Sequence, residues 1–119
     1  MMILLTMIFL HIVDDYYLQG ILAQMKQKKF WKEQASDEKY RFDYIWALLM
    51  HSFSWAFMIM LPLMFAAPVS PIFYVTFVLN LVVHAYVDDL KANRHAINLW
   101  GDQLIHMMQI AFTYFIIMA

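Results

Sequence analysis

Residues 43–67 read DYIWALLMHSFSWAFMIMLPLMFAA, and this stretch decides the fold class. A helix that crosses the roughly 30 Å hydrocarbon core of a membrane needs about 20 mostly apolar residues. Here a single acid, Asp43, stands at the start, and one histidine, His51, lies among bulky apolar residues. The stretch therefore predicts a membrane-spanning helix, which Pro62 is expected to kink or end because proline removes a backbone hydrogen bond.

The rest of the chain has the same character. Of its 119 residues, 64% are hydrophobic and 14% are charged, whereas a soluble domain averages about 45–50% apolar and 25% charged residues. A soluble fold of this size buries only about two-thirds of its surface, so it could not hide this much apolar side chain. The composition excludes an ordinary soluble enzyme and a disordered tail. The net charge of −1 gives no reason to expect a nucleic-acid partner, and the absence of cysteine excludes thiolate chemistry.

Three further apolar stretches complete a predicted all-α, four-helix transmembrane bundle that forms one domain over residues 1–119. They cover residues 1–24, 71–90 and 98–119. Ser70 followed by Pro71 is typical of a helix start. Asp14 and Asp15 interrupt the first stretch, so we expect it either to continue through these acids or to be re-entrant. It has no basic start and no small-residue cleavage site, which argues against a removable signal peptide.

All eight Lys and Arg residues lie in two segments, residues 26–41 and 91–94. With four spans, both segments fall on one side of the membrane, opposite the termini. The positive-inside rule then places them in the cytoplasm and the termini outside. The cytoplasmic loop 25–42 mixes lysines with aromatic residues such as Trp31, which suits the headgroup layer. Three interpretations of this loop stay open: a solvated loop that only fixes topology, a segment that binds anionic lipid, and a segment that contacts nucleic acid.

Ionisable residues within the predicted spans follow a pattern. His11 and Asp15 are four residues apart, as are His84 and Asp88, and Asp102 and His106 show the same spacing in reverse order. Residues four apart lie on one face of a helix. Counted from the basic side at 1.5 Å per residue, most of these pairs and His51 fall in the cytoplasmic half of the bilayer. An ionised group within a span costs at least about 2.5–3.5 kcal/mol, so we expect these faces to point into the bundle.

A metal site is the simplest chemistry for such a layer. Imidazole and carboxylate ligands suit zinc, with iron or manganese as alternatives, and the ion compensates for the buried acids. The expected set exceeds what one zinc ion needs, so either two ions bind or some members orient the others. It comprises His11, Asp15, His51, His84, Asp88, Asp102 and His106.

Two other interpretations of the same residues stay open. They could line a proton or ion pathway, or they could form purely structural His–Asp hydrogen bonds. Asp14 and Asp89 each adjoin a paired acid and are expected to face about 100° away from it. His95, in the short polar connection, is expected to be solvated.

Four strings carry a resemblance to a known family: HIVDDYYLQ, LLMHSFSW, HAYVDDLKA and LWGDQLIHMMQI, beginning at His11, Leu48, His84 and Leu99. In this order they resemble a domain-of-unknown-function family of small bacterial and phage integral membrane proteins. Its members share an opening H-x3-D with a following Gln, a central His, a second H-x3-D with a Lys close behind, and a final D-Q-x2-H. The corresponding residues here are His11, Asp15 and Gln19; His51; His84, Asp88 and Lys91; and Asp102, Gln103 and His106. The resemblance implies a bacterial inner membrane or a phage setting, and the pattern is loosely similar to membrane-bound metal-dependent hydrolases.

The predicted function is a metal-dependent hydrolase that acts on a lipid or phosphorylated substrate at the cytoplasmic leaflet. A bound metal lowers the pKa of its water towards about 7, and a carboxylate that is not a ligand (Asp14, Asp89 or a member of the pairs) would act as general base. Lys91 would steady an anionic group of the substrate. The alternatives are an ion or proton conductor and a non-enzymatic phage or bacterial accessory protein. Membrane lipid is the expected partner, and self-association stays open.

Overall fold

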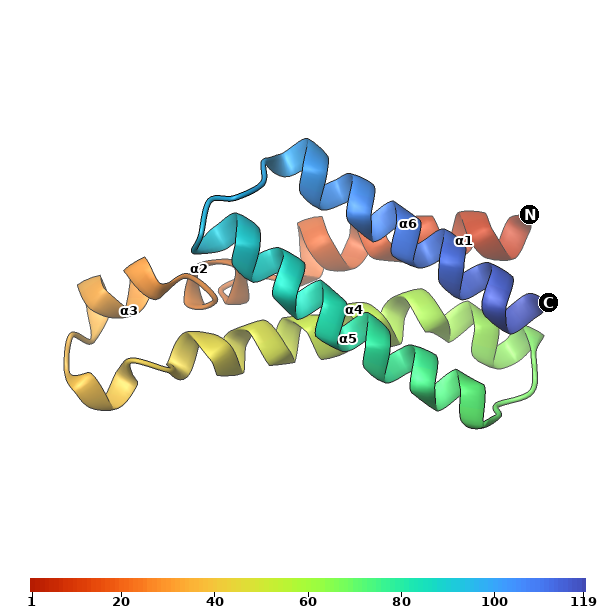
Figure 1. The fold of residues 1–119 in the computed structure, drawn as a ribbon, viewed down its shortest axis with the longest axis horizontal. Helices are drawn as coiled ribbons and strands as arrows, with labels where there is room; N and C mark the ends of the chain where they lie inside the picture. The colour runs from red at the N-terminus through yellow and green to blue at the C-terminus, as the bar shows by residue number, and fades with distance from the viewer.

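The computed structural model describes residues 1–119, and it contains helices and connecting segments without a β-strand. The prediction of an all-α fold is therefore confirmed. The elements, in chain order (Figure 1), are α1 (Met2–Val13), the π-helical turn η1 (Asp14–Leu18), α2 (Leu22–Met25), α3 (Lys28–Gln34), the 3₁₀ turn η2 (Glu38–Tyr40), α4 (Asp43–Ala66), α5 (Pro71–Ala92) and α6 (Leu99–Met118).

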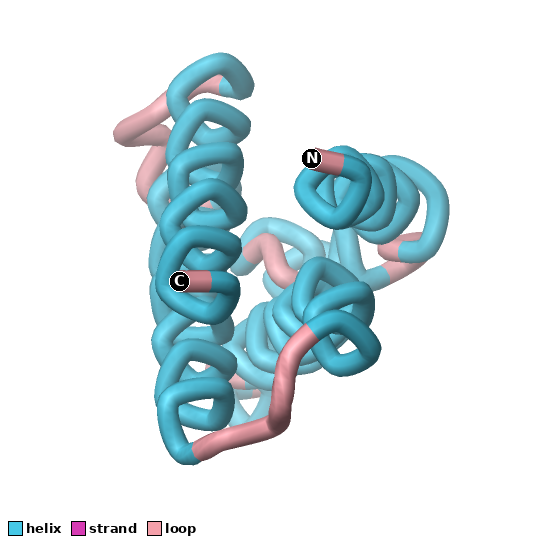
Figure 2. Tube along the Cα trace, turned by 90° about the vertical axis from the view of Figure 1, so that its right-hand side faces the viewer, coloured by secondary structure: helices cyan, strands magenta, loops and turns pink.

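The long helices lie lengthwise in a body of 48 × 28 × 22 Å. Both chain termini lie at one end, and α2 and α3 form the other end (Figure 1). Figure 2 shows the molecule from the end that carries the termini, where the start of α1 and the end of α6 lie apart from each other. Helix α4 packs against α5 and α1, while α6 packs against α5 and α1. The four elements thus surround a common interior.

Three expected stretches match helices to within two residues at each end, namely α4, α5 and α6. Ser70 precedes α5 and Pro71 is its first residue, as the sequence predicts. Pro62 lies inside α4, which continues to Ala66, so the proline does not end this helix.

The first stretch is not one continuous helix over residues 1–24. Helix α1 ends at Val13, and Asp14 begins the wider turn η1. Gly20 then has φ +54°, a left-handed conformation that glycine adopts without strain. The interruption expected at the two acids therefore takes the form of a change in helix type followed by a break, and π-helical turns of this kind are frequent at functional sites.

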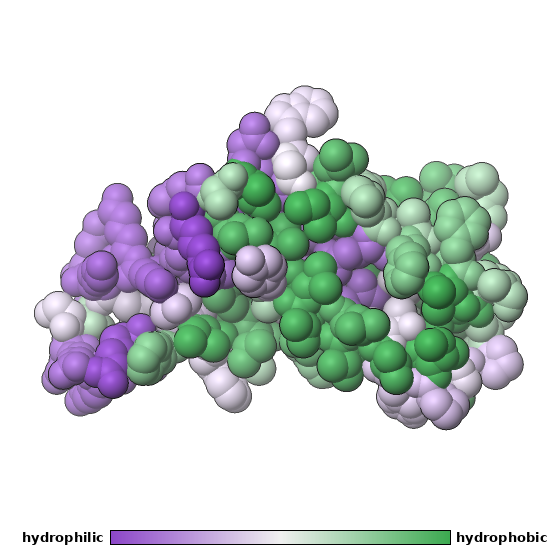
Figure 3. Space-filling model, in the orientation of Figure 1, coloured by the Kyte–Doolittle hydropathy of each residue, from purple (hydrophilic) through white to green (hydrophobic).

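Two helical segments are long and apolar enough to cross a membrane: Glu38–Ala66, which contains α4, and Pro71–Ala92, which is α5. The surface agrees with this property, because large apolar side chains are exposed along every long helix. Figure 3 shows hydrophobic residues over most of the visible face and hydrophilic ones gathered at the end formed by α2 and α3.

The interior is unusually polar. Of the 23 buried residues, 12 are polar or charged, whereas such residues are mostly exposed in soluble proteins. The apolar core is small and consists of eight buried residues: Met7, Trp55, Ala56, Ile59, Met60, Leu63, Phe73 and Ile110. Three more buried apolar residues, Ala47, Leu48 and Val87, lie outside this cluster, and all the other buried residues are polar or charged.

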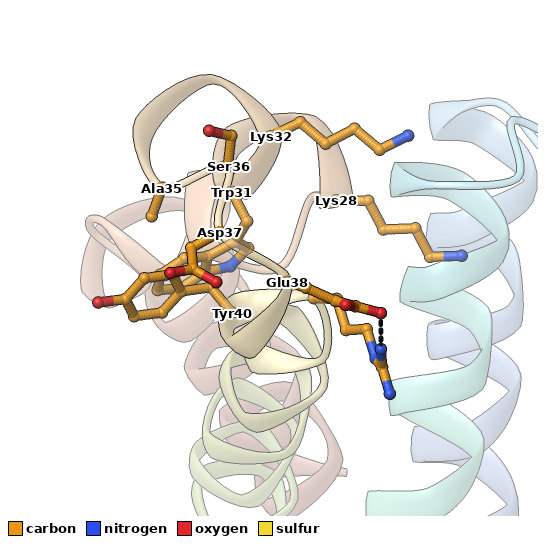
Figure 4. A pocket seen from close by; sticks show the side chains of 9 residues that line it. Lys28, Trp31, Lys32, Ala35, Ser36, Asp37, Glu38 and Tyr40 are labelled. Carbon is orange, nitrogen blue, oxygen red and sulfur yellow. Dashed lines mark hydrogen bonds and ion pairs between the residues drawn. The ribbon is translucent and has the colours of Figure 1, made fainter.

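The segment between α2 and α4 forms the hydrophilic end of the molecule. Its Trp31 and Tyr40 rings are stacked with centroids 6.3 Å apart. They line a pocket of about 300 Å³ together with Lys28, Lys32 and the ion-paired residues Glu38 and Arg41 (Figure 4). The pocket contains none of the predicted metal ligands. Its mixture of basic and aromatic side chains is consistent with the predicted headgroup contact and with a solvated loop.

Asn93 ties this segment to the end of α5. Its Nδ2 donates to the backbone oxygen of Lys26 (2.9 Å), and its Oδ1 accepts from the backbone N–H of Lys28 (2.7 Å). At about 0.5–1.5 kcal/mol per hydrogen bond, Asn93→Ala should make detachment of the segment easier by about 1–3 kcal/mol. We expect trypsin to cleave near Lys28 and Lys29 about 5- to 150-fold faster, because cleavage follows the population of the open form. Glu33→Gln, which loses only the exposed ion pair with Lys29, serves as the control, and equal rates for the two variants would contradict the expectation.

Candidate metal centre

Four side chains from three elements direct donor atoms to one buried point. Asp15 comes from η1, His51 from α4, and His84 and Asp88 from α5. The Nε2 atom of His51 lies 3.1 Å from Nε2 of His84 and 3.1 Å from Oδ1 of Asp15. The side chains of both histidines and of Asp88 are at most 2% exposed, and that of Asp15 is 9% exposed. Backbone elements far apart in sequence thus place two imidazoles and two carboxylates together.

Two of the separations among these donors match those around a tetrahedral ion, and the others lie on either side of that range. With metal–ligand bonds of about 2.0–2.2 Å, tetrahedral ligand atoms lie about 3.3–3.6 Å apart. Beyond the two contacts already given, Oδ2 of Asp88 lies 3.4 Å from Nε2 of His51 and 3.5 Å from Nε2 of His84. The remaining measured separation, between Nε2 of His84 and Oδ1 of Asp15, is 4.0 Å. Asp15, His51 and His84 form one group that could hold a metal ion, and Asp88 contacts both of its histidines.

Ring packing holds His84 in place. Its imidazole stacks on Trp55, with centroids 4.2 Å apart and planes at 22°, and on His106, with centroids 4.1 Å apart and planes at 24°. Trp55 and His106 also contact each other, with centroids 5.2 Å apart, so the three rings form one packed group that restricts the orientation of His84 without a bound ligand. Such preorganisation is what a precise binding constellation requires.

The carboxylate of Asp14 lies next to the second ring nitrogen of His51. Oδ2 of Asp14 lies 3.6 Å from Nδ1 of His51, and Oδ1 of Asp14 accepts a hydrogen bond from Ser54. Oδ2 of Asp14 makes no hydrogen bond, so Asp14 adds negative charge beside His51 without a bond that fixes its ring. The Asp14 side chain is buried, which differs from the expectation that it would face away from the cluster; the π-helical turn brings both adjacent aspartates inward.

His11 is hydrogen-bonded at both ring nitrogens. Trp55 Nε1 donates to its Nδ1 (2.7 Å), and its Nε2 donates to Oε1 of Gln103 (2.9 Å). Gln103 in turn donates to Oδ2 of Asp102 (2.9 Å) and Oδ2 of Asp15 (3.3 Å). His11 thus lies within the cluster but has no ring nitrogen left for an ion, and its hydrogen bonds orient Gln103 and thereby the carboxylates.

Two lysines contact the cluster from its hydrophilic side. Lys26 Nζ lies 2.7 Å from Oδ2 of Asp88, and Lys91 Nζ lies 3.2 Å from Oδ2 of Asp102. With Asp14 and Asp15 there are four carboxylates and two ammonium groups, a net charge of −2 when the histidines are neutral. Buried charge is costly unless it is compensated. One divalent cation would supply the missing charge.

A second group of donors adjoins the first. Nε2 of His106 lies 3.3 Å from Oδ1 of Asp88 and 3.3 Å from Oδ1 of Asp102. His84, Asp88 and His106 form one further group that could hold an ion, and Asp15, Asp102 and His106 form another. From His106 a chain of hydrogen bonds continues away from the cluster: Nδ1 of His106 contacts Gln109 (3.0 Å), Gln109 donates to Asn80 (3.2 Å), and Asn80 donates to Thr113 (2.7 Å).

The structure brings all seven predicted ligands into one buried cluster. Lys91 also lies there, whereas Asp89 points elsewhere, accepting from Asn93 and pairing with Arg94. His95 is exposed, as expected. Sequence reasoning missed Lys26, which carries no signal that separates it from the neighbouring lysines. Comparison with family models, curated proteins and solved structures finds no match.

Proposed function

We propose that the chain is an integral membrane protein of four spans that binds a divalent metal and hydrolyses a lipid or phosphorylated substrate at the cytoplasmic leaflet. The observation that carries this proposal is the group of donor atoms from Asp15, His51 and His84, with Oδ2 of Asp88 3.4 Å and 3.5 Å from the two histidine nitrogens. In lipid, ionisable residues face the bundle interior and mark functional sites by default. A polar interior beneath an apolar surface fits that environment.

The positions of the cations support the topology. The segment from Lys26 to Arg41 and the end of α5 lie at one end of the molecule, opposite both termini (Figure 1), and Asn93 joins them directly. Under the positive-inside rule this end faces the cytoplasm. We place the chain in a bacterial inner membrane on the strength of the family resemblance, with α1 and η1 as the first span and α6 as the fourth.

The residues of the centre divide into three roles under this proposal. Asp15, His51 and His84 would hold the ion, and zinc suits this set, with iron or manganese as alternatives. Lys26 neutralises Asp88 and so weakens it as the fourth ligand, which favours the open position that catalytic sites keep. Asp14 would supply negative charge next to His51. A bound divalent ion supplies an activated water near neutral pH and polarises a phosphoryl or acyl oxygen.

A groove between α1–η1 and α6 supports an amphiphilic substrate. It has a volume of about 560 Å³, within the range of about 300–1,000 Å³ usual for ligand pockets. Its one polar lining residue is Gln103, which also contacts Asp15 and Asp102 of the cluster. The apolar lining is suited to a hydrocarbon chain and is formed by Ile12, Tyr16, Tyr17, Leu99, Trp100 and Met107. A lipid lying there would have its polar group next to the centre.

Metal analysis tests the proposal. We expect protein purified in mild detergent to contain zinc, iron or manganese by mass spectrometry, and to release phosphate or fatty acid from anionic lipid in mixed micelles until a chelator is added. His84→Ala combined with Asp88→Ala should lose both the metal and the release, while Asp89→Asn, which alters an aspartate outside the cluster, should keep both. Wild-type protein that stays folded and takes up none of these metals when they are supplied would overturn the proposal.

Proton or ion conduction is a second candidate function, favoured by the hydrogen-bonded chain from His106 through Gln109 and Asn80 to Thr113. This series of hydrogen bonds ends at Thr113, and the helices also enclose a buried apolar cluster that includes Ile59. We therefore expect no flux across liposomes that contain the protein. Flux that Asn80→Leu abolishes would favour the conductor over the hydrolase.

A further inference from the structure

The hydrogen bonds of His106 show which of its two ring nitrogens carries a hydrogen. Gln109 uses its Nε2 to donate to Asn80, so the amide oxygen Oε1 faces His106 and accepts from its Nδ1 (3.0 Å). Nδ1 therefore carries a hydrogen, and when the ring is neutral Nε2 has a lone pair. The hydrogen-bond chain thus fixes the tautomer that a metal ligand needs.

The lone pair of His106 points at two carboxylate oxygens. Oδ1 of Asp88 and Oδ1 of Asp102 each lie 3.3 Å from it, and all three side chains are at most 2% exposed. Asp102 Oδ1 is buried and accepts no hydrogen bond, which is rare for a buried polar atom. A lone pair of Nε2 repels a carboxylate oxygen at this distance unless a cation lies between them. That cation is either a proton on His106 or a metal ion.

We infer that a second divalent ion binds between His106, Asp88 and Asp102, next to the first ion and together with a phosphoryl anion. The inference rests on the proposed first site. Asp88 turns Oδ2 towards His51 and His84 and Oδ1 towards His106, so one carboxylate is shared between the two donor sets. In two-metal sites of phosphatases and nucleases the ions lie about 3.5–4 Å apart and clamp a phosphoryl group between them.

Charge explains why the anion belongs to the site. The four carboxylates and two lysines carry −2, which the first divalent ion cancels. A second ion leaves the buried cluster at +2, an unfavourable charge in a poorly hydrated interior. A phosphate dianion restores neutrality, whereas a neutral ester does not. The second ion and the anion should therefore bind cooperatively, which assigns the substrate to the phosphorylated compounds.

Titration of the full-length protein in detergent with Mn²⁺ tests this inference, with free Mn²⁺ followed by electron paramagnetic resonance. We expect two ions per chain, the second binding about 5- to 150-fold more tightly in inorganic phosphate than in chloride of equal ionic strength, the usual range for coupled sites. Asp102→Asn and, separately, His106→Gln should keep one ion and lose the phosphate effect. Asp89→Asn should behave like the wild type.

The outcomes separate this inference from the proposed function. One ion per chain in both buffers, unchanged by Asp102→Asn, would mean that His106 carries a proton instead, and would overturn the second site while the first stands. The absence of any bound ion from folded wild-type protein would overturn both. Circular dichroism and elution as a single species identify the variants that are folded. If Asp102→Asn does not fold, the conservative His106→Gln change still tests the second site.

Discussion

Replacing His84 by alanine is expected to reduce affinity for the first divalent ion by more than about 100-fold and to abolish hydrolysis. Loss of a partner that only orients a ligand already costs about 10- to 100-fold in metal affinity, and His84 supplies a donor atom itself. Its Nε2 lies 3.1 Å from Nε2 of His51 and 3.5 Å from Asp88. Competition with a chromogenic chelator would measure the affinity.

Matched variants separate this effect from damage to the fold. His95→Ala removes the exposed imidazole in the connection before α6 and should leave affinity unchanged. Because His84 also packs against the rings of Trp55 and His106, His84→Phe keeps an aromatic ring in that place and should lose the ion while retaining the helical content. Wild-type affinity in either His84 variant would show that this histidine packs against its neighbours without binding metal.

Local periodicity explains why the cluster could be predicted. An i, i+4 pair is a property of a single helix, and the cost of an ionised group in lipid forces each polar face towards the interior. No knowledge of packing is needed to conclude that His84 and Asp88 share a face, or that Asp102 and His106 do. The all-helical fold followed in the same way from long apolar stretches, and α4, α5 and α6 lie within two residues of their expected bounds.

The details that escaped prediction depend on contacts between distant residues. Lys26 reaches Asp88 across 62 positions of sequence from a segment without helical periodicity. The hydrogen bonds at both ring nitrogens of His11 involve Trp55 and Gln103, which are 44 and 92 positions away in the sequence. The expectation that Asp14 faces away holds for an α-helix. The change to a π-helical turn over Asp14–Leu18 has no glycine or proline within it as a sequence signal.

Lys26→Met is expected to destabilise the metal-free protein by about 3–5 kcal/mol, the usual cost of removing one partner of a buried ion pair. Lys26 is 5% exposed, and its ammonium lies 2.7 Å from Asp88, so the variant leaves that carboxylate without its compensating charge. With metal bound, the ion takes over much of this compensation and the loss should be smaller. By linkage, the variant should then bind metal more tightly than the wild type.

Thermal unfolding in detergent, with and without zinc, measures both effects through the fluorescence of buried Trp55. Lys29→Met is the matched control, since Lys29 has an 80% exposed side chain and pairs only with exposed Glu33; it should change neither transition. An equal loss of stability with and without zinc would show that Lys26 and the ion do not share Asp88. A loss of zinc binding would show that the ammonium of Lys26 holds the donor set in place. Tighter zinc binding would mean that Lys26 competes with the metal for Asp88, because two cations that contact the same carboxylate repel each other.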